Sequence, residues 1–349
     1  MKKLCLILLM TLVLALSGCD SNREIRSRYE EACTMLSEGS FDSAREAFEE
    51  VVAAGEYVAE AYRGIGLAQL YSNNYAEACI AFERSLLNSD GMSAEFNRDV
   101  SLYLAFSRTH HAEDAKAMEI YDTLIARDEK DTEVLYLRGR ARMEAGDEAG
   151  AREDFDRAAE GSQDYNLFLN IYQVYEGLGK NADGSAYLEQ ALEIVNQNEE
   201  DHYKKGLVSY YLQNYDDARD ELITAIREDP EDDQSILLLG RVYLRMDDVA
   251  DARAMFREHI RDNEIAASAY NGLALCEMAE GDYDRALEYV NAGLAFEDEE
   301  AARSLKYNEI VIYENLAQWD TARVKAAAYV LLYPTDENGQ REYEFLKNR

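Results

Sequence analysis

The chain is poor in proline, tryptophan and basic residues. Only 2 prolines and 1 tryptophan occur among 349 residues, and with 19 glycines this excludes collagen-like, proline-rich and glycine–serine linker sequences. The 36 basic residues are outnumbered by 70 acidic ones, giving a formal net charge of -34. Because proteins bind nucleic acid through Lys and Arg, this balance excludes nucleic acid as a partner. Hydrophobic residues still make up 47% of the chain, which is enough for a folded protein.

Patterns typical of catalysis and of metal or cofactor binding are also missing from the sequence. The four histidines form no H-E-x-x-H pattern, and the adjacent His110 and His111 would point in different directions on a helix. No phosphate-binding loop, nucleophile elbow or dinucleotide fingerprint occurs. The acidic cluster Glu231-Asp232-Asp233 is expected at a helix N-terminus, where negative charge is favoured. The sequence therefore predicts no enzyme activity, no cofactor and no metal.

The five cysteines do not suggest a disulfide framework. Cys5 and Cys19 belong to the N-terminal segment, which leaves Cys33, Cys79 and Cys276 in the folded body. Their number is odd, and no two stand at a metal-ligand spacing such as C-x-x-C. We expect these three to be small buried hydrophobic residues.

The first nineteen residues have the organisation of an export signal. Lys2 and Lys3 precede an apolar run, residues 4–16, which is shorter than the roughly 20 residues that span a bilayer. Leu16-Ser17-Gly18-Cys19 follows, and this sequence resembles the lipobox of bacterial lipoproteins. The resemblance implies that residues 1–18 are removed and that the Cys19 thiol carries a diacylglycerol. The alternative is an ordinary cleaved signal with a chance cysteine.

A lipid on Cys19 predicts where the protein resides. The acylated cysteine would anchor the chain in the cell membrane on its extracytoplasmic face, with residues 19–24 as a tether. Two acyl chains on one residue are suited to stable anchoring, since each buried methylene contributes about 0.8 kcal/mol.

The rest of the chain is a tandem repeat of about 34 residues. A first helix carries a small or equivalent residue, here called the anchor, at Ala32, Gly66, Ala105, Gly139, Tyr172, Gly206, Gly240, Ala274 and Ile310. Twelve residues after each anchor stand Ala44, Ala78, Ala117, Ala151, Gly184, Ala218, Ala252, Ala286 and Ala322. Four residues further on stand Phe48, Phe82, Tyr121, Phe155, Leu188, Leu222, Phe256, Val290 and Ala326.

These columns resemble the tetratricopeptide repeat, a helix–turn–helix unit with Gly or Ala in helix A and Ala followed by an aromatic residue in helix B. Pro230 and Pro334 both fall 24 residues after an anchor, where that family often ends helix B. The resemblance implies an all-α solenoid of about nine repeats in a right-handed superhelix. We expect the array over residues 25–340 and a capping tail over residues 341–349.

Two kinds of irregularity interrupt the repeat. Tyr172 and Ile310 replace the small anchor, and Gly184 replaces the alanine, so these helix pairs are expected to splay or to shift by a turn. One step between anchors is 39 residues long, which indicates an insertion around Asn88 to Asn97. A lid and a simple long loop are both compatible with it.

In the tetratricopeptide family, helix A residues next to the anchor line an inner groove that binds peptides. Carrying those positions over gives a candidate binding surface, which is rich in Tyr and Arg as protein-recognition surfaces are. Its residues are Arg63, Tyr136, Arg140, Tyr203, Tyr210, Tyr211, Arg241, Arg245, Asn271 and Tyr307. Of these, Arg140, Arg241 and Arg245 are expected to be isolated positive points suited to a carboxylate. A convex edge or the tail remains the alternative binding surface.

Two functional hypotheses follow. The first is a membrane-anchored, non-enzymatic scaffold that binds a protein or peptide in the cell envelope. The second is an envelope-assembly factor that positions or activates a cell-wall or outer-membrane biogenesis enzyme. A hydrolase or small-ligand receptor would require a group of reactive residues that the sequence does not contain. The sequence leaves the partner and the oligomeric state open.

Overall fold

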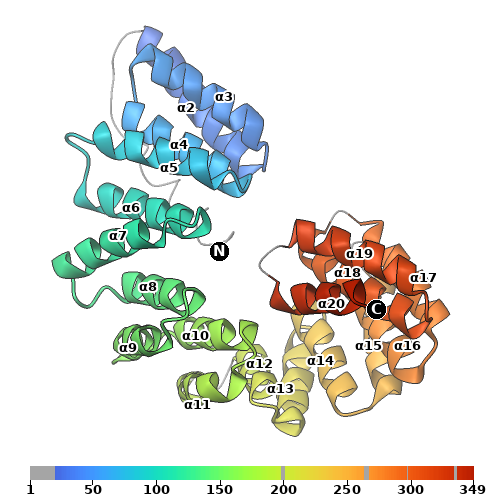
Figure 1. Ribbon diagram of the computed structural model, residues 1–349. Coiled ribbons are helices and arrows are strands. Elements are labelled where there is room, and N and C mark those ends of the chain that lie inside the picture. The colour runs from blue at the N-terminus through green and yellow to red at the C-terminus, as the bar shows by residue number, and fades with distance from the viewer. Residues whose placement is uncertain (1–19, 198–200, 263–266, 297, 334–335) are drawn as a thin grey trace. The chain divides into compact units, whose positions relative to one another are not determined.

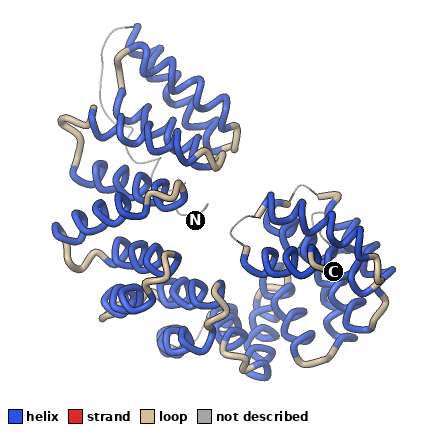
Figure 2. Tube along the Cα trace, viewed as in Figure 1, coloured by secondary structure: helices blue, strands red, loops and turns tan. Residues whose placement is uncertain are grey.

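The computed structural model describes residues 20–197, 201–262, 267–296, 298–333 and 336–349. Within these ranges the chain forms nineteen helices, α2 to α20, and no strand (Figure 2). The expected all-α fold class is confirmed. The signal segment, Cys19 and Pro334 lie outside the described residues.

Eighteen of the described helices form nine consecutive hairpins, each with an A helix followed by a B helix (Figure 1). The A helices are α2 (Asp20–Ser37), α4 (Val58–Tyr71), α6 (Ala94–His110), α8 (Thr132–Glu144), α10 (Tyr165–Gly177), α12 (His202–Tyr211), α14 (Asp233–Arg245), α16 (Ala267–Glu280) and α18 (Glu299–Asn315). The B helices are α3 (Phe41–Ala54), α5 (Tyr75–Leu87), α7 (Asp114–Arg127), α9 (Glu148–Ala159), α11 (Asn181–Asn196), α13 (Tyr215–Glu228), α15 (Val249–Asp262), α17 (Tyr283–Leu294) and α19 (Trp319–Leu332).

The repeat columns coincide with the helix contacts. Every anchor lies on an A helix, and both following columns lie on B helices with their side chains buried. Phe256 shows why the anchor is small: a methyl group added at Gly240 or at Gly272 would lie 2.6 or 2.5 Å from its ring carbons. The ring therefore fills the space between its own A helix and the next one, which joins neighbouring repeats into one core.

Tyr172 and Ile310, the two large anchors, are both buried. Tyr172 is buried on α10 and faces Gly184 on α11, where a methyl group would lie 3.2 Å from the tyrosine ring. Ile310 is fully buried on α18, and its hairpin has Ala326 in the column that elsewhere holds a large residue. In α10–α11, Gly184 makes room for the tyrosine while Leu188 still fills the large column, and in α18–α19 the small Ala326 stands in the large column beside Ile310, so close packing is kept.

Each turn between an A and a B helix has one residue with positive φ, always seven residues after the anchor. Gly39, Gly146, Gly179 and Gly281 occupy four of these turns, with φ between 68° and 83°. The following backbone N–H donates to the carbonyl five residues earlier at 2.8–2.9 Å in all nine turns. This is the Schellman motif, which satisfies the last carbonyls of the A helix. The turns therefore have the same geometry whichever residue fills the position.

Aspartates at the turns between repeats act as N-caps. Asp201 accepts a hydrogen bond from the backbone N–H of Lys204 at 3.2 Å, and Asp232 accepts from those of Gln234 and Ser235 at 3.1 and 3.3 Å. The predicted helix-N-terminal placement of these acidic residues is confirmed. Pro230 lies in the turn between α13 and α14.

The insertion predicted around Asn88 to Asn97 forms a connection at residues 88–93 and a longer A helix. Helix α6 has 17 residues, against 13 or 14 in α4 and α8, and the Ser93 hydroxyl caps it by accepting from the N–H of Phe96 at 3.0 Å. Part of the inserted sequence is therefore helical and packs with the array.

The last hairpin is followed by α20 (Glu337–Lys347), which packs against α19. Leu346 is 1% exposed and joins Ile310, Ala322 and Ala326 in one apolar cluster. The segment expected as a capping tail therefore contains the side chain that covers this cluster.

The chain divides into two compact units, Met1–Ser162 and Gln163–Arg349. In the first unit, α2, α4, α6 and α8 contact one another in sequence, and in the second unit α12, α14, α16 and α18 do the same. Within each unit the A helices therefore form a continuous layer. This layer presents the predicted binding residues.

Ion pairs of two arginines connect helices α7, α8 and α9 in the first unit. Arg138 on α8 donates from Nε to Asp154 Oδ2 on α9 at 2.9 Å and from Nη1 to Asp122 Oδ1 on α7 at 2.6 Å. Arg142 donates to the same Asp154 carboxylate at 2.8 Å. Asp154 is fully buried and Arg138 is 8% exposed, so both charges depend on each other for solvation.

The turn geometry predicts opposite effects for two substitutions. Ala112 adopts φ 57° at the position that glycine fills in four other turns, so Ala112→Gly should raise the free energy of unfolding by about 1 kcal/mol. Gly146→Ala should lower it by about the same amount. Urea denaturation measures both, with Ala126→Gly on the exposed face of α7 as a control that should destabilise. A loss of stability for Ala112→Gly would contradict the prediction.

The buried carboxylate predicts a large cost of truncation. Asp154→Ala leaves the guanidinium of Arg138 with fewer acceptors in a buried site, and the free energy of unfolding should fall by about 3 kcal/mol. Glu153→Ala removes an exposed carboxylate from the same helix and should change it by less than about 0.5 kcal/mol. Equal urea midpoints for the two variants would show that the Asp154 ion pairs do not stabilise the unit.

Candidate protein-binding surface

The ten residues predicted from the sequence lie on A helices in both units. Arg63 lies on α4, and Tyr136 and Arg140 lie on α8 in the first unit. The other seven lie in the second unit: Tyr203, Tyr210 and Tyr211 on α12, Arg241 and Arg245 on α14, Asn271 on α16 and Tyr307 on α18. Their side chains take three different roles.

The predicted residues of the first unit are engaged in packing. Arg63 forms an ion pair with Asp99 of α6, and its guanidinium lies 5.7 Å from the ring centre of Phe96. Arg140 donates to Glu144 at 2.9 Å, and its guanidinium lies 5.9 Å from the ring centre of Phe106. The expectation that Arg140 is an isolated positive point is therefore wrong. Its charge is already paired within its own helix.

Tyr136 is also part of the packing between helices. Its ring lies 6.1 Å from that of Phe155 on α9, and burial raises the pKa of its hydroxyl. The residue contributes a half-buried ring rather than an open contact surface.

Five residues of α12 and α14 form what we call the tyrosine–arginine patch: Tyr203, Tyr210, Tyr211, Arg241 and Arg245. The rings of Tyr210 and Tyr211 meet edge to face with their centres 5.6 Å apart. Tyr211 meets Tyr172 of α10 in the same way at 5.5 Å, which fixes the orientation of its ring. Tyr203 packs against the apolar cluster of α13 and α14. The aromatic part of the patch is therefore held in place by the core beneath it.

The two arginines of the patch are exposed and lie one turn apart on α14. The hydroxyl of Tyr210 lies beside Arg245 and raises the pKa of its guanidinium. Arg241 has no ion pair with any carboxylate among the described residues. These two accessible guanidinium groups can each donate paired hydrogen bonds to a carboxylate of a bound segment. The fixed aromatic rings beside them can contact an apolar or aromatic side chain of the same segment.

Some other arginines of the second unit are already paired. Arg253 of α15 donates to Glu277 of α16 at 3.1 Å and also contacts Glu280. Arg219 of α13 donates to Asp216 at 3.0 Å and to Asp220 at 2.9 Å. Arg241 and Arg245 differ from these paired arginines: Arg245 lies near the Glu176 carboxylate, and Arg241 has no ion pair among the described residues.

Asn271 and Tyr307 belong to a separate polar pocket of about 370 Å³ in the second unit. Its lining residues are Asn271, Leu275, Arg303, Ser304, Tyr307, Asn308, Tyr329, Asp336 and Asn338. Asn308 Nδ2 donates to Asn271 Oδ1 at 2.7 Å, so the side-chain amides of these two residues hydrogen-bond to each other. Tyr307 meets Tyr329 edge to face at 5.8 Å, and burial raises the pKa of its hydroxyl.

The charged residues of that pocket were missed by sequence reasoning. Arg303 donates from Nη2 to Asp336 Oδ2 at 2.6 Å, and Tyr329 donates to the same oxygen at 2.7 Å. These hydrogen bonds contribute to holding the pKa of the buried Asp336 below its ordinary value. Arg303 stands seven residues before the anchor Ile310, which is outside the helix A positions carried over from the family. Asp336 lies 33 residues after Arg303 in the sequence. Only the packing of α20 brings them together.

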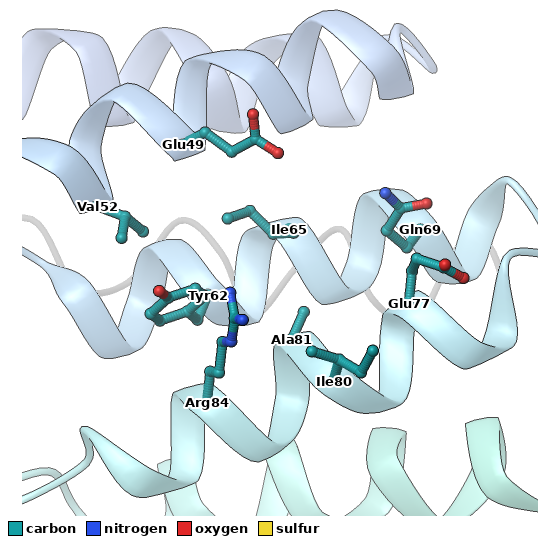
Figure 3. Close-up of a pocket in the computed structure, with 9 residues that line it drawn as sticks. All are labelled: Glu49, Val52, Tyr62, Ile65, Gln69, Glu77, Ile80, Ala81 and Arg84. Atoms are coloured by element: carbon teal, nitrogen blue, oxygen red, sulfur yellow. The ribbon is translucent and has the colours of Figure 1, made fainter.

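The first unit contains a second open pocket, which we call the α3–α5 groove (Figure 3). It has a volume of about 310 Å³ and is lined by Glu49, Val52, Tyr62, Ile65, Gln69, Glu77, Ile80, Ala81 and Arg84. Arg84 reaches from α5 toward Tyr62 of α4, with its guanidinium 5.6 Å from the ring centre. The sequence signal that could have found this groove is Ile80, which is half exposed at a B-helix position that holds Glu in four other repeats.

The cysteines of the folded body are free and largely buried. Cys79 and Cys276 are buried, and burial raises the pKa of each thiol to about 11, while Cys33 is partly buried. Across the described residues, no three His, Cys, Asp or Glu side chains come close enough to hold a metal ion. No helix in the described ranges has the length and apolarity needed to cross a membrane.

Comparison with known proteins shows what this architecture is similar to. The mitochondrial import receptor subunit TOM70 of Saccharomyces cerevisiae is 23% identical over 242 residues, a match that spans 67% of this chain and 38% of the receptor. The chain therefore spans less than half the length of this curated relative. A solved tetratricopeptide repeat protein from Parabacteroides merdae is 18% identical, with a TM-score of 0.45, over 82% of this chain and 99% of that one.

The solved structure of yeast Tom70 is 15% identical with a TM-score of 0.44, over 92% of this chain and 88% of that one. The tetratricopeptide repeat family itself matches residues 29–93, 115–166, 203–245 and 237–304. These matched segments cover more than half of the sequence and fall on the helix hairpins described above. The chain belongs to the tetratricopeptide repeat family.

Proposed function

We propose that this protein is a membrane-anchored, extracytoplasmic scaffold that binds a protein or peptide at the tyrosine–arginine patch. The repeat fold is of the kind that serves protein binding. The single observation that supports the choice of site is the pair of exposed guanidinium groups, Arg241 and Arg245, beside the ordered rings of Tyr210 and Tyr211. No catalytic step is part of the proposal.

The patch favours a segment that combines an acidic group with an apolar or aromatic one. A carboxylate can take two parallel hydrogen bonds from one guanidinium, and Arg241 is available for them. Tyrosine rings offer a large contact area with little loss of side-chain freedom, and those of Tyr210 and Tyr211 are already oriented. The strong negative charge of the remaining surface would repel acidic segments elsewhere, which favours binding at this position.

The membrane anchor is proposed from the sequence. Leu16-Ser17-Gly18-Cys19 supports acylation of Cys19, and the first described helix begins at Asp20. The repeat array would then follow the lipid directly. A partner that is itself an envelope-assembly enzyme would make the protein an assembly factor, and identification of the bound protein separates the two roles.

The patch predicts the binding behaviour of two arginine variants. Peptides are selected from a random library on the purified full chain, and their affinities are measured by fluorescence anisotropy. Arg241→Ala and Arg245→Ala should each weaken the selected acidic peptides about tenfold or more, because a charged hydrogen bond is lost. Arg219→Ala removes an arginine that is paired on α13 and should leave the affinity unchanged. Selected peptides that bind the Arg241→Ala, Arg245→Ala double variant as tightly as the native chain would remove the patch from the proposal.

The lipobox predicts a change in partitioning. In a bacterial host, the native chain should enter the detergent phase of a Triton X-114 separation, whereas Cys19→Ser should leave it, since the acylated thiol is gone. Cys33→Ser alters a cysteine of the folded body and should partition like the native chain. Mass spectrometry of the N-terminal peptide identifies the lipid. Retention of Cys19→Ser in the detergent phase together with an unmodified N-terminal peptide in the native chain would contradict acylation.

A further inference from the structure

Exposed large hydrophobic side chains are confined to three of the described helices. Ile80 and Leu87 lie on α5, Val324, Leu331 and Leu332 on α19, and Phe345 on α20, and each is about half exposed or more. The first four occupy only two positions of the repeat, 14 and 21 residues after the anchor.

Other repeats fill the same two positions differently. Position 14 holds Glu46, Glu119, Glu153, Ala186, Asp220, Ala254 and Glu288, and position 21 holds Ala53, Ala126, Glu160, Glu193, Arg227, Arg261 and Ala295. An aliphatic side chain at both positions therefore distinguishes α5 and α19 from the other B helices. A solvent-exposed position does not by itself favour a large aliphatic side chain, so these residues on α5 and α19 call for another explanation.

On α19 these side chains form a ridge, which we define as Val324, Ala328, Leu331 and Leu332. All four are exposed, and Val324 and Leu331 are two turns apart on one face. Arg323 and Lys325 stand on either side of Val324. Arg323 pairs with Asp320 and Lys325 with Glu309, but both basic side chains remain about two-fifths exposed.

The charge of the C-terminal segment differs from that of the chain as a whole. Residues 319–349 contain five acidic and five basic side chains, whereas the chain has a net charge of -34. The ridge is therefore set in a neutral region with basic side chains beside it. An acidic surface can approach it without the repulsion that the rest of the protein would exert.

The α3–α5 groove has the complementary features. Its floor and walls include Val52, Ile65, Ile80 and Ala81, which are apolar (Figure 3). Its charged lining residues are Glu49, Glu77 and Arg84. Glu49 accepts from Arg45 at 2.7 Å and Arg84 lies over Tyr62, which leaves Glu77 as the exposed carboxylate without an ion pair among the described residues. The groove therefore offers an apolar recess with the Glu77 carboxylate at its edge, and the ridge offers apolar side chains with the basic Arg323 and Lys325 at its edge.

We infer that the α19 ridge of one copy of this chain docks in the α3–α5 groove of a second copy. The contact would cover Ile80, Val324 and Leu331 and place Arg323 near Glu77. A single helix in a groove gives an interface at the small end of the known range, below about 1,200 Å², so the association is weak and depends on concentration. The two surfaces differ, so the contact is head-to-tail, and it either closes into a ring or continues as a chain. The inference does not depend on the peptide-binding patch.

The experiment uses full-length chains in membranes with two different tags. One copy carries Glu77→Cys at the groove and the other carries Arg323→Cys at the ridge. Mild oxidation should give a cross-linked product containing both tags. The matched control pairs Arg323→Cys with Glu119→Cys, which places the thiol on α7 at position 14, away from the groove.

Directionality is tested with Leu331→Glu. Added to the ridge copy, it should reduce the cross-linked product about tenfold, because a carboxylate cannot enter the apolar groove beside Glu77. Added to the groove copy, it should have no effect, because that copy uses only its α3–α5 groove. Glutamate is compatible with the fold at this position, since Glu160 and Glu193 occupy it in other repeats.

Each other result overturns the inference. A product no stronger than that of the control pair shows that the ridge is covered by something else, such as lipid. Equal losses with Leu331→Glu on either copy show that the contact is not head-to-tail. A chain carrying both cysteines that cross-links only within itself shows that the two helices meet in one molecule.

Discussion

The structure depends on the match in size between one side chain on each A helix and the side chains on the B helices that pack against it. Where the A helix carries glycine, a ring such as Phe256 fills the gap, and a methyl group added at Gly240 would collide with it. Where the A helix carries Tyr172 or Ile310, Gly184 or Ala326 makes room instead. The combined volume is conserved while its distribution varies, as close packing requires. Because the Phe256 ring also touches the next A helix, this one contact both closes a hairpin and attaches it to its neighbour.

The sequence predicted the parts of the fold that are determined locally. The anchor columns located every helix pair, because the small residue and the large one that packs against it recur at a fixed spacing. The exchange of large and small residues at Tyr172 and Gly184 was not predicted because each column was considered alone. The two positions had to be considered together, since they face each other in space.

The binding surface was less predictable because it depends on partners distant in sequence. Arg241 and Arg245, chosen from family positions, lie exposed on α14, yet nothing local showed that Arg140 is paired with Glu144 or Arg63 with Asp99. In a chain with about twice as many acidic as basic residues, most arginines have a carboxylate within reach, and only the fold decides which remain available. Arg303 and Asp336 illustrate this, since α20 brings together two residues 33 positions apart.

The uniform turns limit how such a protein can change its length. Every A–B turn uses the same backbone conformation and the same 2.8–2.9 Å closing hydrogen bond, so an added residue there would break the cap and rotate the B helix out of contact. The extra residues before α6 entered at the junction between hairpins, where no such bond is lost. Growth or shortening by duplication and loss of entire hairpins is therefore the route that this architecture leaves open to evolution.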